Sequence, residues 1–344
     1  MKISEKNEEK NDSNKILKKE NIIFIHEDSK GGIESIFSFK DGDLLVFKNT
    51  FSIIFDGNTF QQKLVLPFLG AICAFLYLSE EEFILLKGNH FSLFKFKKGR
   101  TEYQKLYTVT NDYEENKKIF HLSNDNLIKL GEFNFEQIIK IYQRNNNGSS
   151  PSYNIIENTE LKDIDCVYNL EQDEFLTIQN IQNSDEIFFK VYSNIDYTIL
   201  RFNRINCTVN NKRRIYFSQM PFFKVGKNKI LYGSIFYLNI FGIDTLELET
   251  TVNISESIKD IKLLSNDCII LVECQDINWK EKNYFLTKIW FDFEKNEIKK
   301  KETTDITDKT GDYKTLFNIY NYLDNGLATI SDHSKLKVYK NINS

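Results

Sequence analysis

Apolar residues recur along the chain in a short repeated pattern that predicts β-strands. The pattern is apolar, any residue, apolar, aromatic, and alternation of this kind is typical of a half-buried strand. Seven tetrapeptides follow it, two of them with a lapse at the first position: Ser52 to Phe55, Phe91 to Phe94, Ile139 to Tyr142, Phe189 to Tyr192, Leu238 to Phe241, Thr287 to Trp290 and Leu336 to Tyr339. Their closing aromatic residues are 39, 48, 50, 49, 49 and 49 residues apart. A step this regular indicates an internal repeat.

A second signal runs in phase with the tetrapeptides. Before most of them stands a polar turn followed by an apolar stretch, as at Asp41-Gly42-Asp43, Asn124-Asp125-Asn126 and Asp324-Asn325-Gly326. Asn, Asp and Gly favour tight turns because they tolerate positive φ or bond their own backbone. Each repeat therefore predicts four strands, of which the third ends in an aromatic residue and the fourth is more polar.

Four strands every 40 to 50 residues are typical of a β-propeller blade. The sequence predicts an all-β, seven-bladed propeller. We expect the innermost strands, near Ala71 and Ile164, to be the ones buried on both faces, because apolar residues occupy most of their length. We also expect residues 64–78, an apolar run broken by Pro67 and Gly70, to form two buried strands; 15 residues are too few for a membrane span, which needs about 20.

The two ends of the chain predict how the last blade is completed. Only five residues follow Tyr339, which leaves the seventh repeat without a fourth strand, whereas residues 21–28 predict a strand with no blade of its own. We expect this N-terminal strand to pair with residues 336–339 and so to protect an open edge. Residues 1–20 are charged and without periodicity, which predicts a disordered tail before a single domain at 21–344.

The last repeat, Leu327 to Lys340, resembles the strand, Asp-containing turn and strand that end a WD40 repeat, and the resemblance extends over residues 21–341. It implies a WD40-like propeller. The chain departs from the family in having no Trp-Asp at the strand ends and no Gly-His pair before the inner strands. Without the polar network of those residues, we expect apolar packing to stabilise the blades.

Composition limits the function classes. The formal net charge is −4, which disfavours nucleic acid as a partner. Five scattered cysteines and no apolar leader favour a reduced intracellular location, cytoplasmic or nuclear.

Candidate catalytic and metal-binding residues are few. The four histidines are His26 near the end of the closing strand, His90 and His333 in short turns, and His121 in an inner strand where it can line the central channel. Asp163, Asp165 and Asp260 lie near inner strand ends, where some propeller enzymes hold calcium. Cys268 and Cys274 are six residues apart in one predicted strand, roughly 20 Å along it, and cannot share a metal ion. We expect no enzyme, no metal ion and no cofactor.

Two stretches are candidates for partner binding on the face formed by the loops between blades. One holds Trp279 and Lys280. Trp279 is a large, rigid side chain in a polar loop. The other lies between the fourth and fifth repeats and combines basic with aromatic residues: Arg201, Arg204, Lys212, Arg213, Arg214 and Tyr216. The leading hypothesis is a non-catalytic scaffold or complex subunit that binds protein or peptide. The alternatives are an enzyme with a metal or small-ligand site at the channel, and phosphoinositide or nucleic-acid binding by the basic patch.

Overall fold

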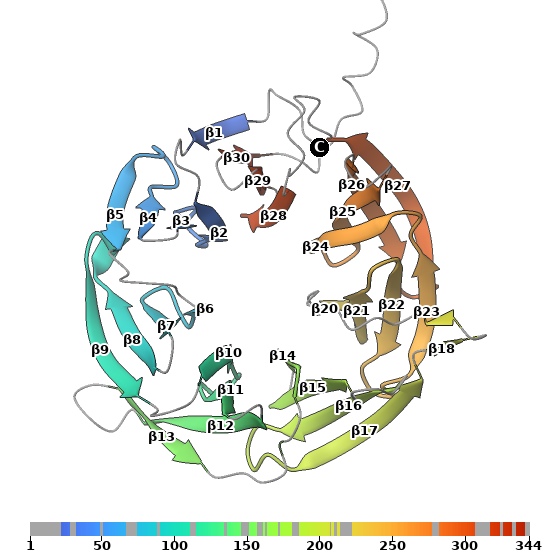
Figure 1. Ribbon diagram of the computed structural model, residues 1–344, viewed down its shortest axis with the longest axis horizontal. Coiled ribbons are helices and arrows are strands. Elements are labelled where there is room, and N and C mark those ends of the chain that lie inside the picture. The colour runs from blue at the N-terminus through green and yellow to red at the C-terminus, as the bar shows by residue number, and fades with distance from the viewer. Residues whose placement is uncertain are drawn as a thin grey trace, which may run out of the picture. The chain divides into compact units, whose positions relative to one another are not determined.

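The computed structural model consists almost entirely of antiparallel β-sheet (Figure 1). It describes residues 22–27, 32–48, 51–66, 74–87, 90–110, 115–133, 136–145, 151–156, 161, 164–170, 173–180, 186–206, 208–209, 212–213, 222–276, 282–306, 317–323, 326–331 and 335–340. Among these residues no helix is long and apolar enough to cross a membrane. The predicted tail at 1–20 lies outside the described residues.

Seven sheets of four strands follow one another along the chain, each with its strands in sequence order apart from the last. Blades one and two are β2 (Ile33–Ser38), β3 (Leu44–Lys48), β4 (Ser52–Phe55), β5 (Gln62–Leu66), then β6 (Ala74–Tyr77), β7 (Glu82–Lys87), β8 (His90–Phe96), β9 (Tyr103–Thr110). Blades three and four are β10 (Glu115–His121), β11 (Leu127–Phe133), β12 (Glu136–Asn145), β13 (Ser152–Ile156), then β14 (Cys166–Asn169), β15 (Glu174–Asn180), β16 (Glu186–Ser193), β17 (Ile199–Asn206).

Blades five and six are β20 (Phe222–Val225), β21 (Lys229–Gly233), β22 (Tyr237–Gly242), β23 (Leu248–Asn253), then β24 (Ser257–Ser265), β25 (Cys268–Asp276), β26 (Lys282–Asp292), β27 (Glu297–Asp305). Blade seven is β28 (Phe317–Tyr322), β29 (Gly326–Ser331), β30 (Lys335–Tyr339) and β1 (Ile22–Glu27). A small hairpin, β18 (Thr208–Val209) and β19 (Lys212–Arg213), and the 3₁₀ turn Lys98–Arg100 are the other described elements. The seven-bladed β-propeller that the repeat predicts is confirmed.

The N-terminal strand completes the last blade as expected. β1 pairs antiparallel with β30, with Phe24 opposite Val338 and His26 opposite Leu336. Each of the seven closing aromatic residues of the tetrapeptides lies in the third strand of its blade.

The described strands divide into two compact units. One carries blades five, six and seven together with β2 and β3, and the other carries blades two, three and four together with β4 and β5. The single domain at 21–344 stays a prediction.

The burial of the strands corrects two expectations. The second strands are largely buried, as in β3 and β7, whereas the first strand is only half-buried at Phe75 to Tyr77 and exposed at Asn169. A first strand has a hydrogen-bonded neighbour on one side only, so its other edge is left for solvent or a pocket. In the apolar run at 64–78, β5 is the fourth strand of its blade and Val65 is 39% exposed, so it is not a buried strand.

A polar anchor repeats from blade to blade, which the sequence did not lead us to expect. The backbone N–H two residues after the closing aromatic donates to the turn between the first and second strands. In blades one and three the acceptor is a buried side chain: Gly57 donates to Asp43 Oδ1 at 3.0 Å and Arg144 to Asn126 Oδ1 at 3.1 Å. In blades two, four and five it is a turn carbonyl, in the pairs Phe96 to Glu81, Asn194 to Asp173 and Ile243 to Asn228. Apolar packing is therefore not the only force that stabilises the blades.

Glycine is required at one of these anchors. A Cβ at Gly57 would lie 2.3 Å from the Gly42 carbonyl carbon and 2.7 Å from the Asp43 nitrogen, closer than any real contact. The turn that follows β4 thus packs directly on the backbone of the β2–β3 turn, and only a residue without a side chain fits.

Candidate functional site

The predicted partner-binding residues fall into three groups. Trp279, Lys280, Arg214 and Tyr216 lie outside the described residues. Lys212 and Arg213 form β19, and only their backbone is described. Arg201 and Arg204 are in β17, the fourth strand of blade four, rather than in the loop after that blade, so their predicted placement is corrected. The proposal that any of them binds a partner remains a prediction.

Arg201 and Arg204 each form an ion pair with a glutamate of their own blade. The Arg201 guanidinium donates to both Glu174 carboxylate oxygens, at 3.1 and 2.8 Å, and both side chains are about three-quarters buried. Arg204 pairs with Glu186 and lies 5.8 Å from the centre of the Phe188 ring. A fork-to-carboxylate pair is the strongest arrangement for arginine, and it neutralises the charge that a phosphate group would need. The ion pairs therefore favour a structural role for Arg201 over phosphoinositide binding.

Exposed apolar side chains concentrate around the same strand. Ile195, in the turn between β16 and β17, is 81% exposed, Leu200 is 49% exposed and Phe202 is 66% exposed. With Ile199 they are four of the ten exposed large apolar residues among those described, and they span eight positions of the chain. Large apolar patches on a protein surface mark interaction sites. The sequence signal was Ile199, Leu200 and Phe202, which place apolar residues on both faces of a fourth strand that needs only one apolar face.

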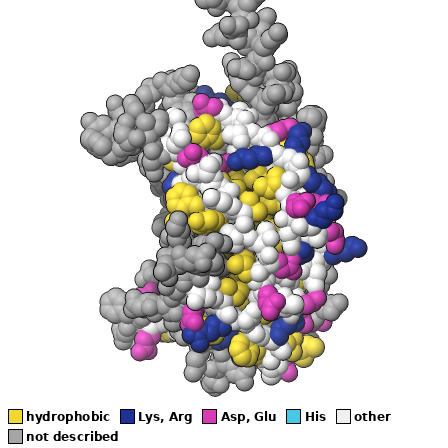
Figure 2. All heavy atoms as spheres, turned by 90° about the vertical axis from the view of Figure 1, so that its right-hand side faces the viewer, with side chains coloured by type: hydrophobic (Ala, Val, Ile, Leu, Met, Phe, Trp, Pro, Cys, Tyr) yellow, Lys and Arg dark blue, Asp and Glu magenta, His cyan; other side chains and the backbone are white. Residues whose placement is uncertain are grey.

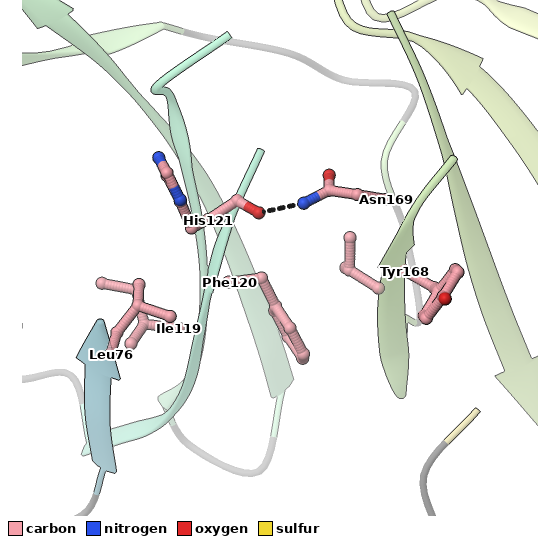
Figure 3. Close-up of a pocket in the computed structure, with 7 residues that line it drawn as sticks. Leu76, Ile119, Phe120, His121, Tyr168 and Asn169 are labelled. Atoms are coloured by element: carbon pink, nitrogen blue, oxygen red, sulfur yellow. Dashed lines mark hydrogen bonds between the residues drawn. The ribbon is translucent and has the colours of Figure 1, made fainter. Parts of the chain in front are cut away.

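The first strands of blades two, three and four together line a pocket of about 410 Å³ (Figure 3). Leu76 comes from β6, Ile119 to His121 from β10, and Val167 to Asn169 from β14. Phe120 points into the space between β10 and β14, and the Asn169 amide points at the His121 carbonyl, to which it donates at 2.6 Å. The volume is within the range of small-ligand pockets, and the walls are mainly apolar.

His121 is the histidine that lines this pocket, as its predicted place in an inner strand suggested. Its Nε2 lies 3.2 Å from Asp125 Oδ1 in the turn that follows β10. A histidine held by a carboxylate is able to exchange a proton, but acid–base catalysis also needs a second group that converges on the substrate. Among the described residues no cluster of three His, Cys, Asp or Glu side chains is placed to hold a metal ion.

The other candidate residues have structural partners. Asp260 accepts a hydrogen bond from the backbone N–H of Ile319 at 3.2 Å, and this bond connects blade six to blade seven. Asp260 also pairs with Lys262 of its own strand at 2.8 Å. Burial raises the pKa of the Cys268 thiol to about 11, and it also raises the pKa of Cys166. A thiol that stays protonated is a poor nucleophile. His90 is in β8 rather than in a turn, while His333 and Asp163 lie outside the described residues.

Comparison with known proteins reveals the fold. No protein-family model and no curated protein sequence matches the chain. Solved structures do match: the Neurospora crassa Pan2 WD40 domain has a TM-score of 0.55 at 11% identity and covers 92% of this chain and 90% of its own. The fold is that of a seven-bladed β-propeller, and in it the chain is similar to this WD40 domain.

Two further structural neighbours come from complexes. One is a chain of BBS1N crystallised with ARL6DN, with a TM-score of 0.57, 11% identity, and coverage of 93% of this chain and 96% of that one. The other is a chain of the mitotic checkpoint complex, with a TM-score of 0.58, 9% identity, and coverage of 93% and 94%. At these identities the likeness establishes the β-propeller fold and nothing finer.

Proposed function

We propose that this chain is a non-catalytic, intracellular platform for protein–protein interaction. The observation that supports it is the exposed apolar cluster of blade four, in which Ile195, Leu200 and Phe202 lie on the surface. Exposing such side chains costs solubility and contributes nothing to the core, so a partner that covers them is the physical reason to keep them. Neighbours found in complexes with other proteins agree with this proposal.

Native co-purification from the source cell tests the platform. The full chain is expected to enrich the same partners in repeated preparations, compared with an unrelated seven-bladed propeller carrying the same tag. The double substitution Ile195→Ser with Phe202→Ser is expected to lose at least one partner, because both side chains are exposed and their loss leaves the core intact. Phe236→Ser is the matched control, since Phe236 is 42% exposed and belongs to the turn before β22.

Trp279 belongs to the same proposal as a second anchor. The variant Trp279→Ala is compared with wild type in the same co-purification, and loss of a partner that survives the blade-four substitutions assigns two docking sites to the platform. If neither set of substitutions changes the enriched proteins, and none is enriched over the unrelated propeller, the platform proposal is wrong.

The pocket on β6, β10 and β14 favours one second candidate function, small-ligand binding. Its volume and apolar walls suit a small molecule, and His121 with Asn169 supplies polar groups at one end. Native mass spectrometry of the freshly purified chain is expected to show an adduct that is lost in His121→Ala, with elemental analysis to detect a metal. If wild type and His121→Ala both show only the mass of the polypeptide, small-ligand binding is contradicted.

A further inference from the structure

One face of blade four carries two aromatic rings and two cations in a checkerboard. In the pairing of β16 with β17, Lys190 lies opposite Phe202 and Phe188 lies opposite Arg204. The alternate residues of β16, Ile187, Phe189 and Val191, are buried on the other side of the sheet. We call Phe188, Lys190, Phe202 and Arg204 the checkerboard face.

Both cations of this face lie close to the ring of Phe188. The Lys190 ammonium lies 5.9 Å and the Arg204 guanidinium 5.8 Å from the centre of the Phe188 ring. Within the part of the chain that the structure describes, Lys190 has no carboxylate in contact, whereas Arg204 is paired with Glu186. The face thus presents Lys190 as a cation available to a partner, and Arg204, whose side chain is 58% exposed, as a second. It also presents the exposed ring of Phe202.

We propose that the checkerboard face docks an acidic segment of a partner protein that inserts a Leu, Ile or aromatic side chain beside Phe202 and places carboxylates over Lys190 and Arg204. This inference rests on the platform function proposed above and assigns its partner class. Phe202 supplies the apolar anchor, and the two cations determine which flanking residues are favoured, because like charges close to them are repelled.

Docking takes place through side chains rather than by addition of a strand. β17 is the end strand of its sheet, and end strands are open to pairing with another chain. The backbone N–H of Arg204, however, is bonded at 2.8 Å to the side-chain oxygen of Asn203. An added strand would have to displace that bond, whereas a segment resting on the face leaves it in place.

Charge also decides against two other occupants. A second copy of this chain would bring Lys190 and Arg204 close to their own equivalents, since β17 has two arginines and no acidic residue. An anionic membrane would meet the Glu186 carboxylate, which pairs with Arg204, next to the cations. A protein segment places its carboxylates one by one and avoids both problems.

The test is selection of 12-residue peptides displayed on phage against the full-length chain, followed by fluorescence anisotropy with the most enriched peptide. The pool is expected to be net negative and to contain Leu, Ile, Phe or Trp between acidic residues. Phe202→Ser is expected to weaken binding about tenfold or more, and Lys190→Glu to weaken it several-fold with a loss of salt dependence. Phe236→Ser is the control and is expected to bind within about twofold of wild type.

Each other outcome overturns the inference. A neutral or basic pool, no enriched peptide, or binding that survives both Phe202→Ser and Lys190→Glu excludes the checkerboard face as an acidic-segment site. Concentration-dependent dimerisation abolished by Phe202→Ser assigns the face to a second copy, and sedimentation with phosphoinositide vesicles abolished by Lys190→Glu assigns it to a membrane. In these cases partners that still co-purify leave the platform function standing. Selective peptide binding without any co-purified protein would instead contradict the platform itself.

Discussion

Blades three and four are joined differently from blades five and six. The 3/4 seam, the contact between β10–β13 and β14–β17, is held by amide side chains that each bond a particular partner in the other blade: Asn124 to the Asn194 carbonyl, Asn126 to the Tyr197 hydroxyl, Gln137 to both backbone groups of Ile164, Asn169 to the His121 carbonyl and Asn194 to the Ser123 hydroxyl. Their distances are 2.6 to 2.7 Å. An apolar cluster including Leu122, Ile141 and Phe175 lies beneath them.

The 5/6 seam, the contact between β20–β23 and β24–β27, is mainly apolar. Twelve buried apolar residues form one cluster, with Leu231, Ile240 and Phe291 at 0% exposure. Gly226, at a positive φ of 57°, lets its turn approach the Phe293 side chain, where a Cβ would be 3.1 Å away. Its polar part is a small network in which Lys229 and Asn296 both contact the Glu249 carboxylate.

The difference separates two tasks of a contact between blades. Burial of apolar area supplies most of the free energy, but it is not directional and tolerates small shifts. Hydrogen bonds from amide side chains to single atoms add less free energy each, yet they are satisfied in one register only. Breaking the buried one, from Asn126 to Tyr197, leaves a buried group unpaired. We expect the 5/6 seam to dominate stability and the 3/4 seam to determine how blade four, with its exposed cluster, is positioned on blade three.

Figure 2 shows the side that carries β23 and β27, where basic and acidic side chains are interspersed around exposed apolar ones.

The largest effect is expected from Phe291→Ala in the 5/6 seam. Phe291 is fully buried and stacks on Phe293 at 5.1 Å, so its truncation removes apolar burial and leaves a cavity, at a cost of about 3–5 kcal/mol. Urea denaturation followed by circular dichroism measures the free energy of unfolding. Ile298→Ala is the control, because Ile298 pairs with Phe291 across β26 and β27 but is exposed; it should cost less than about 1 kcal/mol. Equal losses in the two variants would contradict the apolar account of this seam.

A smaller loss is expected from Asn126→Ala in the 3/4 seam. Asn126 donates to the Tyr197 hydroxyl at 2.6 Å and accepts the Arg144 backbone N–H. Alanine removes the partner of one buried and one part-buried group, at about 1–3 kcal/mol. Tyr197→Phe removes only one of these bonds and should cost less. A double-mutant cycle in the same urea titrations is expected to show coupling between the two sites. Additive losses would mean that the bond seen between them contributes nothing.

The contrast between the seams explains what could be predicted from the sequence. The seven third strands were predictable because Tyr142, Tyr192 and Phe241 recur at a fixed step, and the closing strand because its residues had no blade. The hydrogen bonds of the 3/4 seam could not be predicted, because their partners are as far as 71 residues apart and asparagine is abundant throughout the chain. The pairing of Arg201 with Glu174 depends on the register between strands, and the pocket is formed by three strands from different blades. A local sequence pattern predicts neither the register nor the way in which such strands come together.

Gln137→Ala is expected to have a still smaller effect, because Gln137 is exposed and solvent replaces part of what it loses. Its side-chain amide donates to the Ile164 carbonyl and accepts the Ile164 N–H, both at 2.7 Å, and together these bonds contribute about 0.5–1.5 kcal/mol. Gln143→Ala, also exposed on β12, is the matched control and should leave the unfolding free energy unchanged within error. Hydrogen exchange at the Ile164 amide should speed up in Gln137→Ala alone; unchanged protection would show that this bond does not hold blade four to blade three.

The smallest effect belongs to the polar network of the 5/6 seam and depends on pH. Hydrogen bonds from Lys229 and Asn296 lower the pKa of Glu249 from its ordinary value of 4.5. A carboxyl with a lowered folded-state pKa binds fewer protons folded than unfolded, so its stabilising contribution is complete above pH 4.5 and is lost as the pH falls through the folded-state value. Unfolding temperatures of wild type and Glu249→Gln should therefore differ slightly at neutral pH and converge in acid. A gap that widens on acidification would reverse the sign and contradict the pairing. The buried apolar cluster of this seam consists of Val, Leu, Ile and Phe, which have no ionisable side chain, so it should not contribute to that pH dependence.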